Sequence, residues 1–261
     1  MNQNGSPSGR RPAAKRRGGG PWRAAIDFVS TKVIDADPAA RGNAHPVIVF
    51  AGSGGKGIAL APLCEHCHAL GYPAFDWTEG YNTIPGRNFD DRLSVLAGHT
   101  SDLLARFEQG ATLIGWSLGG LYARELAKLV KARVRQVITI GTPFNPAADR
   151  VSARRLTRLL DGAAAQINPD LIPRLRTPPP VPTTSIYSRS DGVVDWQTCR
   201  HDEESQWVQD VEIDGSHLGM GCNPAVLGVV TDRLAQPQGE WRPYAGSHRH
   251  ATGEGTLNTR E

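Results

Sequence analysis

The segment ATLIGWSLGG, residues 111–120, constrains the fold of this 261-residue chain more than any other stretch. An apolar run with β-branched side chains ends at a Gly-x-Ser-x-Gly pattern, which is formed by Gly115, Ser117 and Gly119. The apolar-periodic segment LYARELAKLV follows at once. This order predicts a β-strand, a tight turn with Ser117 at its apex, and an α-helix. Because the strand and the helix must approach closely at such a turn, the residues two before and two after the serine have no room for side chains.

Strand-like and helix-like segments alternate along the body of the chain. Strands are predicted at residues 47–52, 72–77, 111–114, 134–141, 183–188 and 208–214. Helices are predicted in the second part of 54–71 and at 91–109, 121–130 and 223–235. Such alternation indicates an α/β fold with a mostly parallel central sheet and helices on both faces. The length suits one large domain with a sizeable core.

The long segment between Gly141 and Thr183 has no strand pattern. Residues 151–167 have a helical pattern, and prolines interrupt the part that follows. An insertion of this kind is where α/β enzymes place a cap or lid over the site, and we expect one at about residues 145–182. Its arginines either form a solvated helix face or attract anionic substrates or a lipid surface; they are Arg150, Arg154, Arg155, Arg158, Arg174 and Arg176.

The two ends of the chain differ from the body in composition. Residues 1–26 are rich in Gly, Ser, Pro and Arg, with six basic residues and no acidic one, so we expect a disordered tail. The formal net charge of +3 comes from this tail, because the remainder has 23 basic and 26 acidic residues. A mildly acidic body gives no support for nucleic-acid binding, whereas the tail either stays solvated or touches an anionic surface. The domain is therefore predicted at 27–244, with a flexible tail at 245–261.

The location of the protein is predicted from what the sequence lacks. No apolar stretch of signal-peptide length follows either Arg-Arg pair, and no run of residues is long enough to span a membrane. We therefore expect a cytoplasmic protein, in which reduced thiols are the ordinary state. Cys64 and Cys67 form a CxxC pattern, but they share a helical face with Leu60, Leu63 and Leu70. This spacing favours two buried cysteines over a zinc or redox site.

A serine nucleophile needs a general base, and the base needs an acid that orients it. At a turn of the kind predicted here the order along the chain is serine, acid, histidine. His201, His217, His248 and His250 all follow Ser117 with room for an acid between, but the last two lie in the C-terminal tail, and His201 lies in the polar stretch HDEESQ. His217 directly follows the strand at 208–214, at the kind of strand end where an open α/β sheet builds its site. His217 is therefore the predicted base.

The acid is predicted just after the preceding strand. Asp191 is the first acid after residues 183–188, and the Asp-Gly turn can aim its carboxylate sideways. Asp195 is the alternative acid, and a plain turn residue is the alternative interpretation of Asp191.

An oxyanion formed during the reaction needs prepositioned N–H donors. The amide of Leu118, at the start of the helix, is one candidate. The amide of Ser53, in the Gly-rich loop after the first strand, is the second candidate, with Gly54 as the alternative.

With these residues the chain resembles the α/β-hydrolase superfamily, and within it the bacterial lipase- or esterase-like serine hydrolases. The similarity covers about residues 46–234 and is best in VIVFAGSGG, GYNTIPGRN, LIGWSLGGLYARELA, VRQVITIGTPF, IYSRSDGVVDW and GSHLGMGCNPAVL. The resemblance implies the α/β-hydrolase fold, with a cap between its sixth and seventh strands. It also implies a catalytic triad of Ser117, Asp191 and His217 that cleaves a carboxylic ester through an acyl-enzyme, with no metal or organic cofactor.

The resemblance leaves several points open. Many relatives have His-Gly or Pro-Gly before the oxyanion residue, where this chain has Ala51-Gly52, so the second oxyanion donor stays undecided. The segment with Asn82 and Gly86 matches a recurring one that would brace the site. In this fold the loops that hold Cys199 and Cys222 are neighbours, so these cysteines either form a disulfide or stay reduced.

These residues leave three functions open. The protein is an ester hydrolase that transfers the acyl group to water, an acyltransferase that transfers it to an alcohol, or a non-catalytic member of the fold that binds a ligand or a partner. For either enzyme the substrate is a small-molecule or a lipid ester.

Overall fold

The computed structural model describes residues 44–52, 61–77, 88–146, 170–202 and 205–246. All of these residues belong to the compact unit Asp37–Glu261. Several predictions lie outside the described residues: the tail at 1–26, most of the tail at 245–261, the helix at 151–167, and the residues Ser53, Gly54, Asn82 and Gly86.

A six-stranded sheet forms the centre of the fold. Its strands are β1 (Val47–Phe50), β2 (Ala74–Asp76), β3 (Ala111–Trp116), β4 (Val134–Ile140), β5 (Thr183–Tyr187) and β6 (Val208–Glu212). They lie in the order β2-β1-β3-β4-β5-β6, and every neighbouring pair is parallel. The six predicted strands are thus confirmed. The order reverses between β1 and β3, and such a switch point is where an α/β sheet opens a crevice at the carboxyl ends of its strands.

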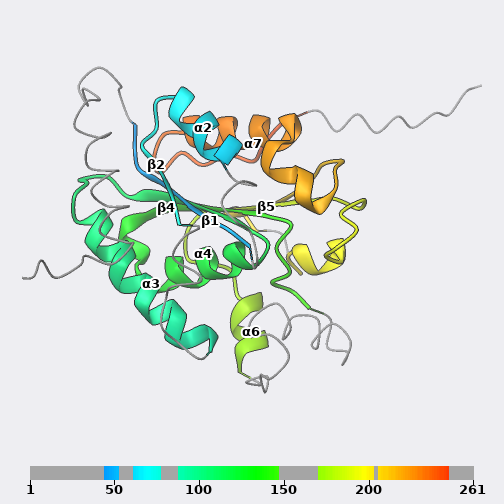
Figure 1. Ribbon diagram of the computed structural model, residues 1–261, viewed down its shortest axis with the longest axis horizontal. Coiled ribbons are helices and arrows are strands. Elements are labelled where there is room, and N and C mark those ends of the chain that lie inside the picture. Colours follow the sequence, from blue (N-terminus) through cyan, green and yellow to red (C-terminus); the bar gives the residue numbers. More distant parts are fainter. Residues whose placement is uncertain (1–43, 53–60, 78–87, 147–169, 203–204, 247–261) are drawn as a thin grey trace, which may run out of the picture. The chain divides into compact units, whose positions relative to one another are not determined.

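Helices cover both faces of the sheet (Figure 1). On one face lie α2 (Ala61–Ala69) and α7 (Pro224–Ala235), and on the other lie α3 (Phe89–Leu104) and α4 (Leu118–Leu129). Alternate residues of the strands, such as Val47, Val49, Ile138 and Ile140, pack with α2 and α7 in one apolar core. Because both faces are covered, the central strands are buried along their whole length, which explains why they are continuous apolar runs in the sequence.

The helix boundaries show where local signals succeed and where they fail. Helix α7 begins as predicted, with Pro224 in its first turn and the side chain of Asn223 accepting from the amide of Ala225. Helix α3 ends at Leu104, five residues before the predicted end. The reason lies far along the chain, because the guanidinium of Arg133 binds the carbonyl oxygens of Leu104 and Phe107. These bonds satisfy carbonyls that a longer helix would use itself.

The four cysteines are free thiols. Cys64 and Cys67 are buried in α2, as predicted, and burial raises the pKa of the Cys67 thiol to about 12. Leu70, expected on the same face, is 38% exposed because the helix ends before it. The disulfide between Cys199 and Cys222 is not formed. The Cys199 thiol is buried against the carbonyl oxygen of Asp195, whereas the exposed Cys222 thiol lies 3.4 Å from that of Gly219.

The predicted cap is described only at its two ends. The short helix α6 (Leu171–Arg176) packs against α4, where the Lys128 ammonium donates to the carbonyl oxygen of Arg174 at 2.6 Å. Among the six described strands the segment lies between β4 and β5. Arg174 is paired with Asp90 and Glu125, and Arg176 binds the carbonyl oxygen of Pro146, so these two arginines bind internal partners rather than forming a solvated face.

Within the described residues, no helix has both the length and the apolar character that crossing a bilayer requires.

Candidate active site

Ser117 occupies the sharp turn that the sequence predicts. It is the single residue between β3 and α4, and its backbone has φ 54° and ψ −123°. Among the described residues no other non-glycine residue has a positive φ. A conformation of this kind costs about 1–3 kcal/mol and persists only where the surrounding structure enforces it. The serine is buried at the carboxyl end of β3, at the N-terminus of α4.

The glycines around Ser117 are required by close backbone approach. A Cβ at Gly115 would lie 2.3 Å from the Cα of Gly120, and a Cβ at Gly119 would lie 2.1 Å from the carbonyl oxygen of Phe50. Both predictions of missing side-chain space are therefore confirmed. Gly120 is also required by close packing, since a Cβ at this position would lie 2.0 Å from Oγ1 of Thr142. The Gly-x-Ser-x-Gly pattern does not include this residue.

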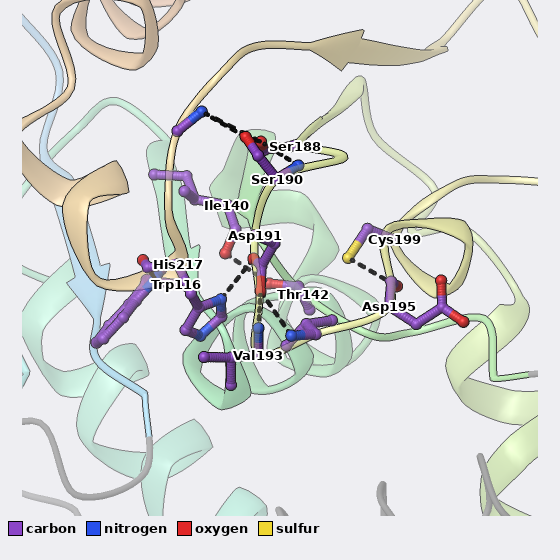
Figure 2. Close-up of polar contacts among 12 residues, drawn as sticks. Trp116, Ile140, Thr142, Ser188, Ser190, Asp191, Val193, Asp195, Cys199 and His217 are labelled. Atoms are coloured by element: carbon purple, nitrogen blue, oxygen red, sulfur yellow. Dashed lines mark hydrogen bonds and ion pairs between the residues drawn. The ribbon is translucent and has the colours of Figure 1, made fainter.

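Asp191 and His217 are brought together beyond the ends of β5 and β6 (Figure 2). Asp191 follows β5, and His217 opens the 3₁₀ helix η5 (His217–Cys222), which follows β6. The ring Nδ1 of His217 lies 2.7 Å from Oδ2 of Asp191, and both side chains are buried. Since an ionised carboxylate only accepts hydrogen bonds, a neutral imidazole in this contact carries its proton on Nδ1 and keeps the lone pair on Nε2.

The carboxylate of Asp191 is held from its other side. Its Oδ1 accepts from the amides of Val193 at 2.9 Å and Val194 at 2.5 Å, which fixes Oδ2 toward the imidazole. Asp195 has a different role, because its exposed side chain accepts from the amide of Gln197 and caps the 3₁₀ helix η4 (Trp196–Cys199). Figure 2 shows the Asp195 carboxylate pointing away from His217. Of the two acids considered, the structure brings Asp191 to the histidine.

Ser117 and the Asp191–His217 pair meet at the end of β4. The amide of Ser117 donates to the carbonyl oxygen of Ile140 at 2.9 Å. The next residue, Gly141, has φ +54°, and a Cβ there would lie 3.1 Å from Nδ1 of His217 and 3.2 Å from Oδ2 of Asp191. The Ile140–Gly141 peptide therefore adjoins both the serine turn and the pair, and glycine is needed at its second position.

The Gly-rich end of β1 also reaches the serine. A Cβ at Gly52 would lie 3.0 Å from Cβ of Ser117, so the backbone leaves β1 directly beside the turn. Leu118 begins α4, where unpaired amides and the helix dipole favour negative charge. The described part of the chain thus contains one oxyanion candidate, Leu118, whereas the candidate Ser53 begins the undescribed segment.

His201 belongs to another buried cluster. Its Nδ1 lies 2.7 Å from Oδ1 of Asp210 on β6, and its Nε2 lies 2.9 Å from the guanidinium of Arg124 on α4. An arginine only donates, so Nε2 of His201 is already occupied as an acceptor.

Two neighbours of the pair were not identified from the sequence. Trp116 donates its indole N–H to the carbonyl oxygen of His217 at 3.1 Å, and Gly141 leaves the space that the imidazole and carboxylate occupy. The Gly-x-Ser-x-Gly pattern treats the position of Trp116 as variable. Gly141 ends a predicted strand, which was the only available signal.

The described residues include no group of three or more His, Cys, Asp or Glu residues that could hold a metal ion.

Comparisons with known proteins agree on the fold. No protein-family model matches the sequence, and no curated protein matches it. Among solved structures, Aspergillus fumigatus lipase B superposes with a TM-score of 0.58 at 18% identity, over 91% of this chain and 64% of that one. An esterase from Pyrococcus furiosus superposes with a TM-score of 0.56 at 19% identity, over 76% and 85%. A monoacylglycerol lipase from Paleococcus ferrophilus superposes with a TM-score of 0.53 at 14% identity, over 72% of this chain and 93% of that one. The chain therefore has the fold of the α/β-hydrolase superfamily.

Proposed function

We propose that this protein is a serine hydrolase that cleaves carboxylic esters through an acyl-enzyme intermediate. The observation that carries the proposal is the strained backbone of Ser117, which adjoins a buried Asp191–His217 pair through one peptide of β4. A fold shared with lipases and esterases is consistent with this reaction, but many functions use this fold, so the proposal depends on the residues of the site.

In the acylation step Oγ of Ser117 attacks the ester carbonyl carbon while Nε2 of His217 takes the hydroxyl proton. The carbonyl oxygen becomes an oxyanion, and the imidazolium that forms is stabilised by Asp191. When the tetrahedral intermediate collapses, the bond to the alkoxy oxygen breaks and Nε2 passes its proton to the leaving alcohol. The serine then carries the acyl group as an ester.

In the deacylation step a water molecule repeats the same sequence. His217 takes a proton from the water as its oxygen bonds to the acyl carbon, and returns that proton to Oγ as the acyl–serine bond breaks. The products are a carboxylic acid and the restored enzyme. The oxyanion of both steps is assigned to the amide of Leu118 and to a second amide at Ser53 or Gly54, directly beyond Gly52.

The surface beside the pair suggests the character of the acyl group. Val193, two residues after Asp191, is 66% exposed, and Leu218, directly after His217, is 72% exposed. Large apolar side chains in such positions favour an apolar acyl group, because its removal from water is favourable. We therefore expect activity toward p-nitrophenyl esters to rise from acetate to butyrate and hexanoate.

The test is labelling with a fluorophosphonate probe, followed by ester turnover. The parent protein is expected to be labelled and to release p-nitrophenol, whereas Ser117→Ala is expected to show neither. Ser101→Ala is the matched control, because Ser101 is an exposed serine of α3 that bonds the carbonyl oxygen of Ala97. Absence of labelling in the parent, or equal labelling of Ser117→Ala, contradicts the proposal and favours a non-catalytic binding protein.

The acceptor of the acyl group is decided by product analysis. Hydrolysis predicts free acid as the main product when an alcohol such as glycerol is added at moderate concentration. Predominant formation of a new ester would identify an acyltransferase with the same three residues.

A further inference from the structure

His217 is held at both ends of its own backbone. Its amide donates to the carbonyl oxygen of Asp191 at 2.9 Å, and its carbonyl oxygen accepts the indole N–H of Trp116 at 3.1 Å. The Trp116 ring also lies against the imidazole, with ring centroids 5.1 Å apart and an interplanar angle of 34°. Figure 2 shows this indole beside His217, on the side away from Asp195.

The two holding residues come from different parts of the fold. Asp191 follows β5, whereas Trp116 is the last residue of β3 and is bonded directly to Ser117. The histidine itself begins η5, and a short 3₁₀ helix has weaker backbone bonds than an α-helix or a strand. A base on such a segment needs external support if it is to stay within reach of the nucleophile.

We propose that Trp116 is a positioning residue for His217, and that its indole N–H ties the base to the serine turn. The inference rests on the proposed function of Ser117 and His217. Rotation or sliding of η5 would break the bond to Trp116, so the bond fixes the distance between the imidazole and the segment that carries Ser117. Asp191 alone orients the ring toward itself and leaves that distance less restrained.

Core filling is the competing role for this side chain. Trp116 is buried and belongs to the apolar core with Ile140 and Met220. A residue that only fills space would affect stability through its volume, and its N–H would be irrelevant. The two roles are therefore separable by removing the N–H while keeping the ring.

The experiment replaces Trp116 with 3-benzothienylalanine, in which sulfur takes the place of the indole N–H, and compares it with Trp116→Phe. Both changes are expected to lower kcat for p-nitrophenyl butyrate by about 10- to 100-fold with KM within about 2-fold, because misplacing a base slows the chemical step more than binding. The benzothienyl variant is expected to keep the parent's urea midpoint. Trp241→Phe is the matched control, since among the described residues the buried indole N–H of Trp241 has no partner, and it is expected to keep parental kcat.

A fluorescence measurement tests the contact independently of activity. The Trp116 emission is taken as the difference between the parent and Trp116→Phe spectra at one pH. Because an imidazole packed against an indole ring quenches its emission, this difference is expected to be larger in the His217→Gln background. This measurement tests the contact between Trp116 and His217 even if the protein cleaves no ester.

The outcomes separate the two proposals. Parental kcat in the benzothienyl variant, with labelling of Ser117 intact, overturns the role of Trp116 and leaves the proposed function standing. Loss of labelling in the parent overturns the proposed function, and the fluorescence comparison then decides whether Trp116 contacts His217. A lowered urea midpoint in the benzothienyl variant equal to that of Trp116→Phe assigns the residue to core filling.

Discussion

The described residues include two histidine–aspartate pairs, one buried and one partly buried, with the same hydrogen-bond length and different surroundings. His217 and Asp191 meet at 2.7 Å beyond β5 and β6, and His201 and Asp210 meet at 2.7 Å beside β6. In both pairs Nδ1 faces a carboxylate, so both rings are expected in the same tautomer. A search for orienting aspartates alone would not separate them.

The second ring nitrogen separates the pairs. Nε2 of His201 faces the guanidinium of Arg124 at 2.9 Å, and both side chains cover the ring of Phe144. Arg124 also donates to the carbonyl oxygen of Leu175 and so connects α4 to α6. In the described part of the chain no such partner occupies Nε2 of His217, and this residue is bonded through its carbonyl oxygen to Trp116, the neighbour of Ser117.

The comparison indicates that the partner of Nε2, the ring nitrogen that does not face the aspartate, determines what each histidine–aspartate pair can do. When a buried guanidinium donates to the lone pair of Nε2, the histidine has a structural role, because the nitrogen cannot accept a proton without breaking a charge-assisted hydrogen bond. A ring nitrogen without such a partner keeps its lone pair available for the base that the proposed function requires.

The largest difference between the two pairs is expected when each aspartate is replaced by asparagine. In Asp191→Asn the amide can donate to Nδ1, which moves the ring proton to Nε2 and removes the base; kcat should fall on the order of 10⁴-fold, as measured with p-nitrophenyl butyrate. In Asp210→Asn the same exchange places an N–H of His201 against Arg124, so the free energy of unfolding should fall while kcat stays within about 3-fold. A large loss of kcat in Asp210→Asn at unchanged stability would reverse the assignments.

Removing the guanidinium is expected to affect stability and not the reaction. Arg124 is fully buried, and burial lowers the pKa of its guanidinium to about 9, so it stays charged at neutral pH. Arg124→Met leaves the His201–Asp210 pair without its buried counterpart and should lower the free energy of unfolding by about 3 kcal/mol in urea titrations. Arg189→Met is the control, because the exposed Arg189–Glu212 pair should contribute less than about 1 kcal/mol. An equal effect of both changes would contradict the role given to Arg124.

The pH dependence of stability gives the smallest expected effect. Burial lowers the pKa of His201 below 6.5, Arg124 lowers it further, and Asp210 and Asp202 oppose the shift. The unfolded chain therefore takes up this proton at a higher pH than the folded chain. The stability contributed by the neutral ring is complete above pH 6.5 and falls as the pH decreases below it, by at most about 1.4 kcal/mol per pH unit.

This effect is measured by comparing His201→Gln with the parent in urea at about pH 7.5 and about pH 5.5. The destabilisation caused by the change should be smaller at the lower pH, where the parent has already lost part of the contribution of His201. Ser101→Ala, an exposed change in α3 that removes no ionisable group, is expected to give the same difference from the parent at both values. A destabilisation by His201→Gln that grows toward acid pH would contradict the direction of the shift.

Much of the fold could be predicted because its signals are local. Apolar and β-branched segments gave the six strands, Asn223 and Pro224 gave the start of α7, and the spacing of Gly115, Ser117 and Gly119 gave the strained turn. Chain order and strand ends then selected Asp191 and His217, which the structure brings within hydrogen-bond distance. Each of these steps depends on periodicity or on turn chemistry within a few residues.

The errors and omissions involve partners that are distant in the sequence. Arg133 ends α3 early, and the packing of Cys199 separates its thiol from that of Cys222. The bond from Arg124 to His201, which excludes that histidine as a base, joins residues 77 positions apart. No local pattern records such contacts, because their energy depends on which side chains the fold places together.

By itself, therefore, the sequence determined the α/β architecture and the strained turn at Ser117, since backbone sterics and alternating apolar segments act over short distances. Only the tertiary structure decided which aspartate faces His217, which histidine is blocked by a guanidinium, and that Trp116 holds the carbonyl of His217. The physical reason is that a hydrogen bond in a buried site requires placement to within a few tenths of an ångström, and that placement comes from the packing of the whole sheet and its helices.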